Sequence, residues 1–296
     1  MEPASKRPRE GEADEDGARL KLQVSLPSGR SEDVLVDPRA TVGDLKLAAQ
    51  RALRQGFLTL TLDGRLLDPA EFLQSAGLRD GDCIAAIAQQ PKVAATQGGF
   101  ALWCIGRDRI VTWGDPAHGG DSTAIQDQLK NVQKIHATHA AFAAILADGT
   151  VVTWGQPLYG GNSARVQDQL KNVQEIHSTA GAFAAILAGG SVVIWGHPEL
   201  GGSYIAAQDQ PRNVQQVCST HFAFAATLAD GSVVPWGHPG HGGDTTTVCD
   251  QLKDVQQLHA TRCAFAAILT DGNLVTWGDP QNGGDSSRVK DQLGYL

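Results

Sequence analysis

The stretch AILADGTVVTWGQPLYGG, residues 144–161, decides the fold because its pattern returns along the second half of the chain. A Trp-Gly pair recurs every 41 residues, and the same period returns a Pro, a Gly-Gly pair and an Asp-Gln pair. The tryptophans that anchor the units are Trp113, Trp154, Trp195, Trp236 and Trp277. A period between about 20 and 50 residues is typical of a solenoid or propeller.

Each unit predicts a small antiparallel sheet. In residues 132–172, the segments VQKIHA, AFAAIL and TVVTWG are separated by polar turns, which is typical of a three-strand meander. The connection to the next unit has room for one short strand around Val166. The alanines of AFAAIL let neighbouring sheets approach closely, while Phe142 and Trp154 fill the larger gaps. This composition favours blades packed face to face around an axis.

The repeat resembles that of the regulator of chromosome condensation, whose core ends in ALxxDGxVxxWG followed by a Gly-rich loop. Its length is similar to the compact form of the repeat in bacterial β-lactamase-inhibitor propellers. That family usually closes with seven blades, whereas this chain has five units, at about 90–130, 131–171, 172–212, 213–253 and 254–296. Five units are compatible with a smaller ring, an open arc or part of a longer array. An open array would leave unpaired edges and favour self-association.

The first half has a different order of predicted elements. LKLQVSL alternates apolar and polar residues like a half-buried strand, and Val42, Leu45, Ala49 and Ala52 form one stripe of a helix. The order strand, strand, helix, strand, strand resembles the ubiquitin-like fold over residues 18–89, with matches at TV, LDGRLL and AGLRDGDCI. The predicted class is therefore mainly β: an α+β ubiquitin-like (β-grasp) domain, then a β-propeller-like array over residues 90–296.

The ubiquitin-like resemblance implies an apolar recognition patch at Pro27, Thr61 and Ile87. Only Ile87 is a clear match to that pattern, so the sequence leaves open whether the head binds standard ubiquitin receptors. Gly98 and Gly99 follow this domain and raise the question of a conjugation tail. Their alignment with Ala140 and Ala141 places them instead in a turn of the first, irregular repeat.

Composition and charge narrow the function. Residues 1–17 are almost entirely charged and polar, which predicts disorder, and Lys6–Arg9 resembles a short nuclear-import signal against the alternative of a solubilising tail. The net charge of −8 argues against general nucleic-acid binding, and no apolar run is long enough to span a membrane. Five widely spaced cysteines favour a reducing compartment, so we expect the cytoplasm or nucleus.

The sequence has no pattern specific for catalysis, a cofactor or a metal. His136, His177 and His259 share one register of the repeat, which indicates a structural role. The aspartates of the Asp-Gln pairs are expected to accept backbone hydrogen bonds in their own loops, rather than to form a cation-binding ring. We therefore expect no enzyme.

Two positions vary between otherwise similar units. One lies at the end of Trp-Gly-x-Pro-x-x, and the other lies in the turn after a recurring Thr. The candidate partner-binding residues are His118, Tyr159, Leu200, His241 and Asn282 at the first position, and His139, His221, Phe222 and Arg262 at the second. Fixed scaffolds with variable tips are how repeat proteins build recognition surfaces, and neutral variation at exposed turns is the alternative.

These observations favour a non-catalytic adaptor that binds other proteins, whose identity the sequence does not give. The ubiquitin-like head suggests a link to ubiquitin pathways, and the repeats supply the partner-binding surface. The family resemblance also implies two alternatives. One is a guanine-nucleotide exchange regulator of a small GTPase, and the other is an inhibitor or glycan-binding propeller.

Overall fold

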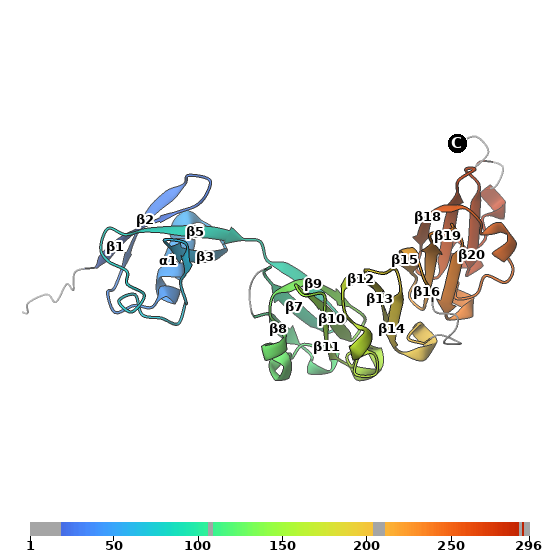
Figure 1. Cartoon of the computed structure of the whole chain (residues 1–296), viewed down its shortest axis with the longest axis horizontal. Helices are drawn as coiled ribbons and strands as arrows, with labels where there is room; N and C mark the ends of the chain where they lie inside the picture. Colours follow the sequence, from blue (N-terminus) through green and yellow to red (C-terminus); the bar gives the residue numbers. More distant parts are fainter. Residues whose placement is uncertain (1–18, 106–108, 204–210, 290–291, 293–296) are drawn as a thin grey trace, which may run out of the picture. The chain divides into compact units, whose positions relative to one another are not determined.

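The chain folds into two compact units that divide between Gln90 and Pro91 (Figure 1). The computed structural model describes residues 19–105, 109–203, 211–289 and 292. The predicted charged tail at residues 1–17 and the predicted import signal Lys6–Arg9 lie outside these residues. No helix in the described ranges is both long and apolar enough to cross a bilayer.

The first unit is a β-grasp domain. Its elements are β1 (Leu20–Ser25), β2 (Ser31–Val36), α1 (Val42–Leu53), β3 (Phe57–Leu62), β4 (Arg65–Leu66) and β5 (Cys83–Gln89). The five strands form one sheet in the order β2-β1-β5-β3-β4, in which β1 and β5 run parallel. This topology confirms the α+β ubiquitin-like prediction.

Helix α1 forms where its sequence supplies both a cap and an apolar stripe. Thr41 and Asp44 form a capping box: the Thr41 hydroxyl accepts from the Asp44 N–H at 3.2 Å, and the Asp44 carboxylate accepts from the Thr41 N–H at 2.9 Å. Val42, Leu45 and Ala49 of the predicted stripe are buried in the core, and Leu53 completes their face. The stripe fixes the helix on the sheet.

The second unit consists of five three-stranded antiparallel sheets, here called blades 1 to 5. Their strands are β6 (Lys92–Ala95), β7 (Gly99–Trp103) and β8 (Val111–Gly114); β9 (Val132–Ala137), β10 (Ala141–Leu146) and β11 (Val151–Gly155); β12 (Val173–Ser178), β13 (Ala182–Leu187) and β14 (Val192–Gly196); β15 (Val214–Ser219), β16 (Ala223–Leu228) and β17 (Val233–Gly237); and β18 (Val255–Ala260), β19 (Ala264–Leu269) and β20 (Leu274–Gly278). This propeller-like array of meanders confirms the fold predicted from the repeat.

Packing within and between blades follows the alternation of small and large residues. In blade 2, Phe142 pairs across the strands with Trp154, and their rings stack with centroids 5.0 Å apart. Ala141, Ala143 and Ala144 are fully buried. The small residues allow the next blade to approach, as predicted, and the stacked aromatic pair fills the space left between sheets.

The connection between blades contains short 3-10 helices instead of the strand predicted around Val166. Those described are η1 (Pro116–His118), η2 (Thr123–Gln128), η3 (Pro157–Tyr159), η4 (Gln167–Gln169), η5 (Pro198–Leu200), η7 (Pro239–His241), η8 (Cys249–Gln251), η9 (Pro280–Asn282) and η10 (Ser287–Val289). The Gln167 amide donates to the Val151 carbonyl at 2.9 Å, and the Ser163 hydroxyl donates to Gln167 at 2.7 Å. These side-chain bonds hold the segment as a turn, so the strand prediction was wrong.

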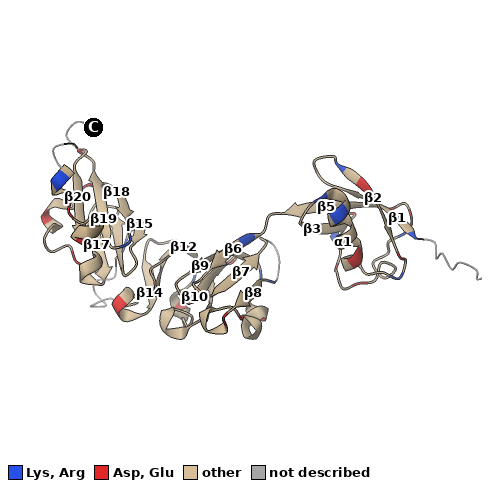
Figure 2. Ribbon diagram, turned by 180° about the vertical axis from the view of Figure 1, so that it is seen from behind, with Lys and Arg blue, Asp and Glu red and all other residues tan. Residues whose placement is uncertain are grey.

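The blades contact one another in chain order through their first strands, β6 with β9, β9 with β12, β12 with β15 and β15 with β18. Figure 2 shows few charged residues on the strands of the blades. The cores between consecutive blades are accordingly built from Ala, Val, Ile, Leu, Phe and Trp.

Candidate functional site

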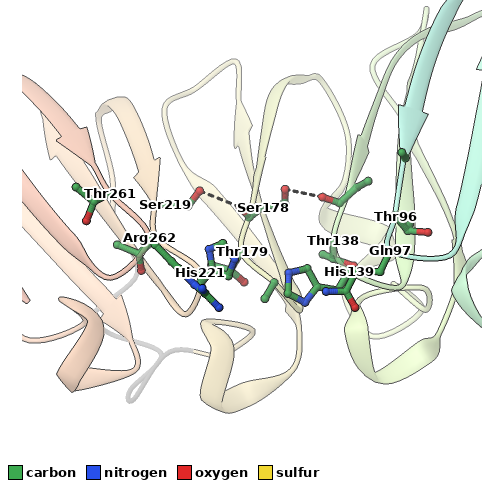
Figure 3. Close-up of a pocket in the computed structure, with 14 residues that line it drawn as sticks. Thr96, Gln97, Thr138, His139, Ser178, Thr179, Ser219, His221, Thr261 and Arg262 are labelled. Carbon is green, nitrogen blue, oxygen red and sulfur yellow. Dashed lines mark hydrogen bonds between the residues drawn. The ribbon is translucent and has the colours of Figure 1, made fainter. Parts of the chain in front are cut away.

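A groove of about 520 Å³ follows the turns between the first and second strands of all five blades. Each blade contributes the recurring Thr and the residue that follows it. These pairs are Thr96 and Gln97, Thr138 and His139, Thr179 and Ala180, Thr220 and His221, and Thr261 and Arg262. We call this feature the turn groove (Figure 3).

The recurring Thr builds the turn and connects it to a second loop. In blade 2, the Thr138 hydroxyl accepts from the Ala141 N–H at 3.1 Å and donates to the Tyr159 carbonyl at 2.9 Å. The same donation reaches His118, Leu200, His241 and Asn282 in the other blades, at 2.8, 2.7, 3.1 and 2.8 Å. The two variable positions of the sequence are therefore tied together in every blade.

A ladder of backbone hydrogen bonds joins the groove residues of consecutive blades. The Gln97 N–H donates to the His139 carbonyl at 2.9 Å, and the His139 N–H donates to the Ala180 carbonyl at 2.9 Å. Ala180 continues to His221, and His221 to Arg262, each at 2.8 Å. The ladder sets the spacing of the groove side chains independently of their identity, so this position can vary without loss of the scaffold.

Serine hydroxyls add a second link between the central blades. The Ser178 hydroxyl donates to the Ala137 carbonyl at 2.8 Å, and the Ser219 hydroxyl donates to the Ser178 carbonyl at 2.8 Å (Figure 3). These bonds use groove-lining hydroxyls for structure. The side chains left to meet a ligand are those of the variable position.

The ionisable side chains that line the groove are all basic. Its described lining residues include Arg262, His139 and His221 and no Asp or Glu. The rings of His139 and His221 meet edge to face at 5.5 Å. Partial burial and the nearby Arg262 lower the pKa of both histidines, and His139 lowers the pKa of His221 further. At neutral pH both histidines are therefore mostly uncharged, and Arg262 supplies the positive charge of the described lining in a chain of net charge −8.

The other candidate residues end the short helices that follow Trp-Gly. Phe222 lies against His241 with ring centroids 4.5 Å apart, and His241 against His238 at 4.7 Å. Partial burial and His238 lower the pKa of His241. Because Phe222 also contacts His221 at 5.8 Å, this aromatic cluster continues from the groove in blade 4. A partner-binding role for His118, Tyr159, Leu200, His241 and Asn282 stays a prediction.

Sequence reasoning singled out the variable residues but missed the Thr hydroxyls and Gln97. The available signal was the recurrence of Thr at one register, at Thr96, Thr138, Thr179, Thr220 and Thr261. A buried hydroxyl that recurs beside a turn indicates a fixed hydrogen bond. Gln97 was hidden because its repeat is irregular.

The prediction that the aspartates of the Asp-Gln pairs accept backbone hydrogen bonds was wrong for the described pairs. Within the described residues, Asp127, Asp168 and Asp250 are exposed and their carboxylates accept no hydrogen bond. The glutamine before the aspartate forms a hydrogen bond instead. The side-chain amide of Gln126 donates to the Ile110 carbonyl at 3.2 Å, and that of Gln167 donates to the Val151 carbonyl at 2.9 Å. The aspartate follows on the solvent side of the turn, where no backbone N–H faces it.

Of the recurring histidines, His136 and His177 are half-buried and His259 is exposed. The pKa of His136 is lowered to about 4 by burial and by the charges of His177 and Lys134. Burial also lowers the pKa of His177, against the opposing effect of Glu175. Across the described ranges, no three His, Cys, Asp or Glu side chains gather in the manner of a metal site.

The ubiquitin-like patch is small. Ile87 is 44% exposed on β5, next to β3, on which Thr61 is half-buried, and Pro27 lies exposed in the turn after β1. Ile87 is therefore the apolar centre of the predicted patch. Its binding role stays a prediction.

Solved structures resemble the two units separately. A ubiquitin from Caldiarchaeum subterraneum is 28% identical over a match that covers 24% of this chain and 95% of that chain, with a TM-score of 0.23. The CRINKLY WD40 ectodomain of the Arabidopsis thaliana receptor kinase ACR4 is 18% identical and covers 64% of each chain, with a TM-score of 0.41. Human WBSCR16 is 16% identical and covers 64% of this chain and 62% of that chain, with a TM-score of 0.40.

The chain thus spans less than two thirds of the latter two proteins. No protein-family model and no curated protein matches the chain.

Proposed function

We propose that this chain is a non-catalytic protein-interaction scaffold whose turn groove binds a carboxylate-rich segment of a partner protein. The observation that carries the proposal is the lining of the groove, which holds Arg262, His139 and His221 and no acidic residue. A guanidinium and a carboxylate form charge-assisted hydrogen bonds, which are about twice as strong as neutral ones. Because the chain as a whole is acidic, nonspecific attraction does not explain such binding.

The histidines make the proposed binding dependent on pH. A bound carboxylate opposes the effects of burial and Arg262 that lower the pKa values of His139 and His221. The complex therefore takes up protons relative to the free protein. Affinity for an acidic segment therefore rises as the pH falls through the pKa values of these two histidines.

The test is fluorescence polarisation with a labelled oligoglutamate peptide and an oligoglutamine control. We expect binding of oligoglutamate alone, weakened by salt and by raising the pH. Arg262→Gln should weaken it about tenfold, which corresponds to about 1.4 kcal/mol. Arg212→Gln is the matched control, since Arg212 is exposed outside the groove. Equal effects of the two substitutions, or equal binding of both peptides, would refute the proposal.

A finer proposal is that the β-grasp head links this scaffold to the ubiquitin pathway. It is supported by the strand order of the head and by exposed Ile87, and the resemblance of the blades to condensation-regulator repeats adds to it. Titration of a purified ubiquitin-receptor domain into labelled protein, followed by NMR, should shift β5 resonances. Ile87→Ala should abolish the shifts, and Leu47→Ala, an exposed apolar residue of α1, should preserve them. Residence in the cytoplasm or nucleus stays a prediction.

A further inference from the structure

Blade 1 exposes the face that every other blade buries. Phe100 and Trp113 are each 44% exposed, although they stack at 5.2 Å like the other aromatic pairs. Their counterparts in blade 2, Phe142 and Trp154, are 0% and 5% exposed. Val111 on the same face is 58% exposed. We call this surface the leading face of a blade, because in blades 2 to 5 it meets the blade that precedes it.

The preceding blade covers the leading face with a fixed set of small and aliphatic residues. Between blades 2 and 3, Ala143, Ile145 and Val151 pack with Phe183 and Trp195 in one buried core. These three residues belong to the opposite surface of blade 2, here called its trailing face. Each interface in the array therefore joins a trailing face to a leading face.

Among the described residues, no blade packs against the trailing face of blade 5. Its residues at the three positions are Ala266, Ile268 and Leu274. All three are half-buried, whereas Ala143, Ile145 and Val151 are buried in blade 2. The two ends of the array thus present the two halves of an interface that the chain already forms four times.

Polar groups at the two ends are complementary as well. In the described part of the chain, the Arg262 N–H donates to no backbone carbonyl and the Gln97 carbonyl accepts from no backbone N–H, whereas interior ladder members do both. The Trp154 indole donates to the Gly119 carbonyl at 3.1 Å, and Trp277 donates to Gly242 at 3.0 Å. Every group that ends the ladder has its missing partner at the other end.

The 41-residue period also identifies the two groups, one at each end of the array, that would form the next indole hydrogen bond. Gly283 follows Gly242 by one period, and in the described part of the chain no blade packs on Gly283 or covers Trp113. A Cβ at Gly242 would lie 2.5 Å from the Phe265 ring, but at Gly283 the nearest atom is 3.8 Å away. The surface on which the next phenylalanine ring lies is therefore open at Gly283. Phe100 holds the repeat position of the phenylalanine whose ring would cover Gly283.

We propose that the leading face of blade 1 binds the trailing face of blade 5 of a second copy of this chain, head to tail. Phe100 of one copy then covers Gly283 of the other, the Trp113 indole donates to the Gly283 carbonyl, and the Arg262 N–H donates to the Gln97 carbonyl. The chain's own blade 5 does not cover Trp113, which is 44% exposed. Such a heterologous contact yields a ring or an open chain of copies.

The test uses the chain of residues 1–296 and measures its mass against concentration by light scattering and sedimentation. Wild type should exceed the mass of one chain as concentration rises. Trp113→Glu blocks the leading face and Ile268→Glu blocks the trailing face, so each alone should self-associate at least about tenfold more weakly. Mixed together, these two variants should form a one-to-one complex, because each retains one intact face. Closure of a single chain into a ring does not produce that complex.

Controls keep the result interpretable. Leu158→Glu alters an equally exposed apolar residue, 53% exposed, that lies on neither end face, and it should associate like wild type. Leu274→Glu provides a second block of the trailing face in case Ile268→Glu fails to fold, as judged by circular dichroism. A wild-type protein that stays monomeric, or two blocked variants that do not combine, would overturn the proposal. So would association that Trp113→Glu leaves unchanged, as expected if the head or another surface were the contact.

Discussion

Trp154 and Trp113 hold the same repeat position in opposite environments. Trp154 is 5% exposed and donates to the Gly119 carbonyl, whereas Trp113 is 44% exposed. We expect Trp154→Ala to lower the free energy of unfolding by about 3–5 kcal/mol, the range for a buried tryptophan. Trp113→Ala should cost far less, since it opens no enclosed cavity. Urea unfolding at low protein concentration measures both, and equal losses would contradict the packing described here.

His136 predicts a dependence of stability on pH. Its pKa is about 4 in the folded chain against an ordinary 6.5, so the unfolded state binds the proton first as pH falls. Its contribution is present above pH 6.5 and is lost as the pH falls toward 4. The shift corresponds to about 3 kcal/mol, at about 1.4 kcal/mol per pH unit.

His136→Gln should therefore reduce the fall in stability between pH 7 and pH 4, measured by urea unfolding at each pH. The pKa of the His136 ring also depends on the charges of His177, Lys134 and Glu175, so these three residues are left unmutated in the comparison. Exposed His259 occupies the same repeat register, and His259→Gln serves as the control. An unchanged slope in His136→Gln would show that the ring protonates alike in both states.

At the scale of elements, the Thr turn joins two loops of each blade. Thr138→Val keeps the shape but removes the donor to the Tyr159 carbonyl and the acceptor for the Ala141 N–H, at a site only 4% exposed. The unpaired groups should cost about 1–3 kcal/mol. Thr138→Ser retains the hydroxyl and should lose less. Thermal and urea unfolding compare the two, and a loss in Thr138→Val no larger than that in Thr138→Ser would contradict a stabilising role of the hydroxyl.

The sequence predicted the elements that its local pattern controls. The alternation and turns of VQKIHA, AFAAIL and TVVTWG set the meander, and the stripe of α1 set the helix. The segment at Val166 was mispredicted because side-chain bonds between Ser163, Gln167 and the strand override an apolar residue's preference for a strand. The sequence did not predict the turn groove, because hydrogen bonds between residues about one period apart set the spacing of its side chains.

At the scale of the whole repeat array, stability accumulates through neighbours. Each described core between blades draws on consecutive units, so an interior blade is held on two faces and a terminal blade on one. In such a one-dimensional array, stability is approximately a sum of unit and interface terms. Opening should therefore begin at the ends, where blade 1 exposes its aromatic face.

Hydrogen exchange tests this gradient and the proposed assembly together. Amides of β13 in blade 3 should exchange more slowly than those of β7 in blade 1 and β19 in blade 5, because opening an end blade breaks one interface and opening the centre breaks two. Raising the protein concentration should slow exchange in β7 and β19 while β13 changes little, since head-to-tail contact supplies each end with its missing neighbour. Trp113→Glu should remove the concentration effect and preserve the gradient. Uniform exchange across the strands at low concentration would contradict the additive array. A gradient that does not change with protein concentration would support the additive array and contradict the head-to-tail assembly.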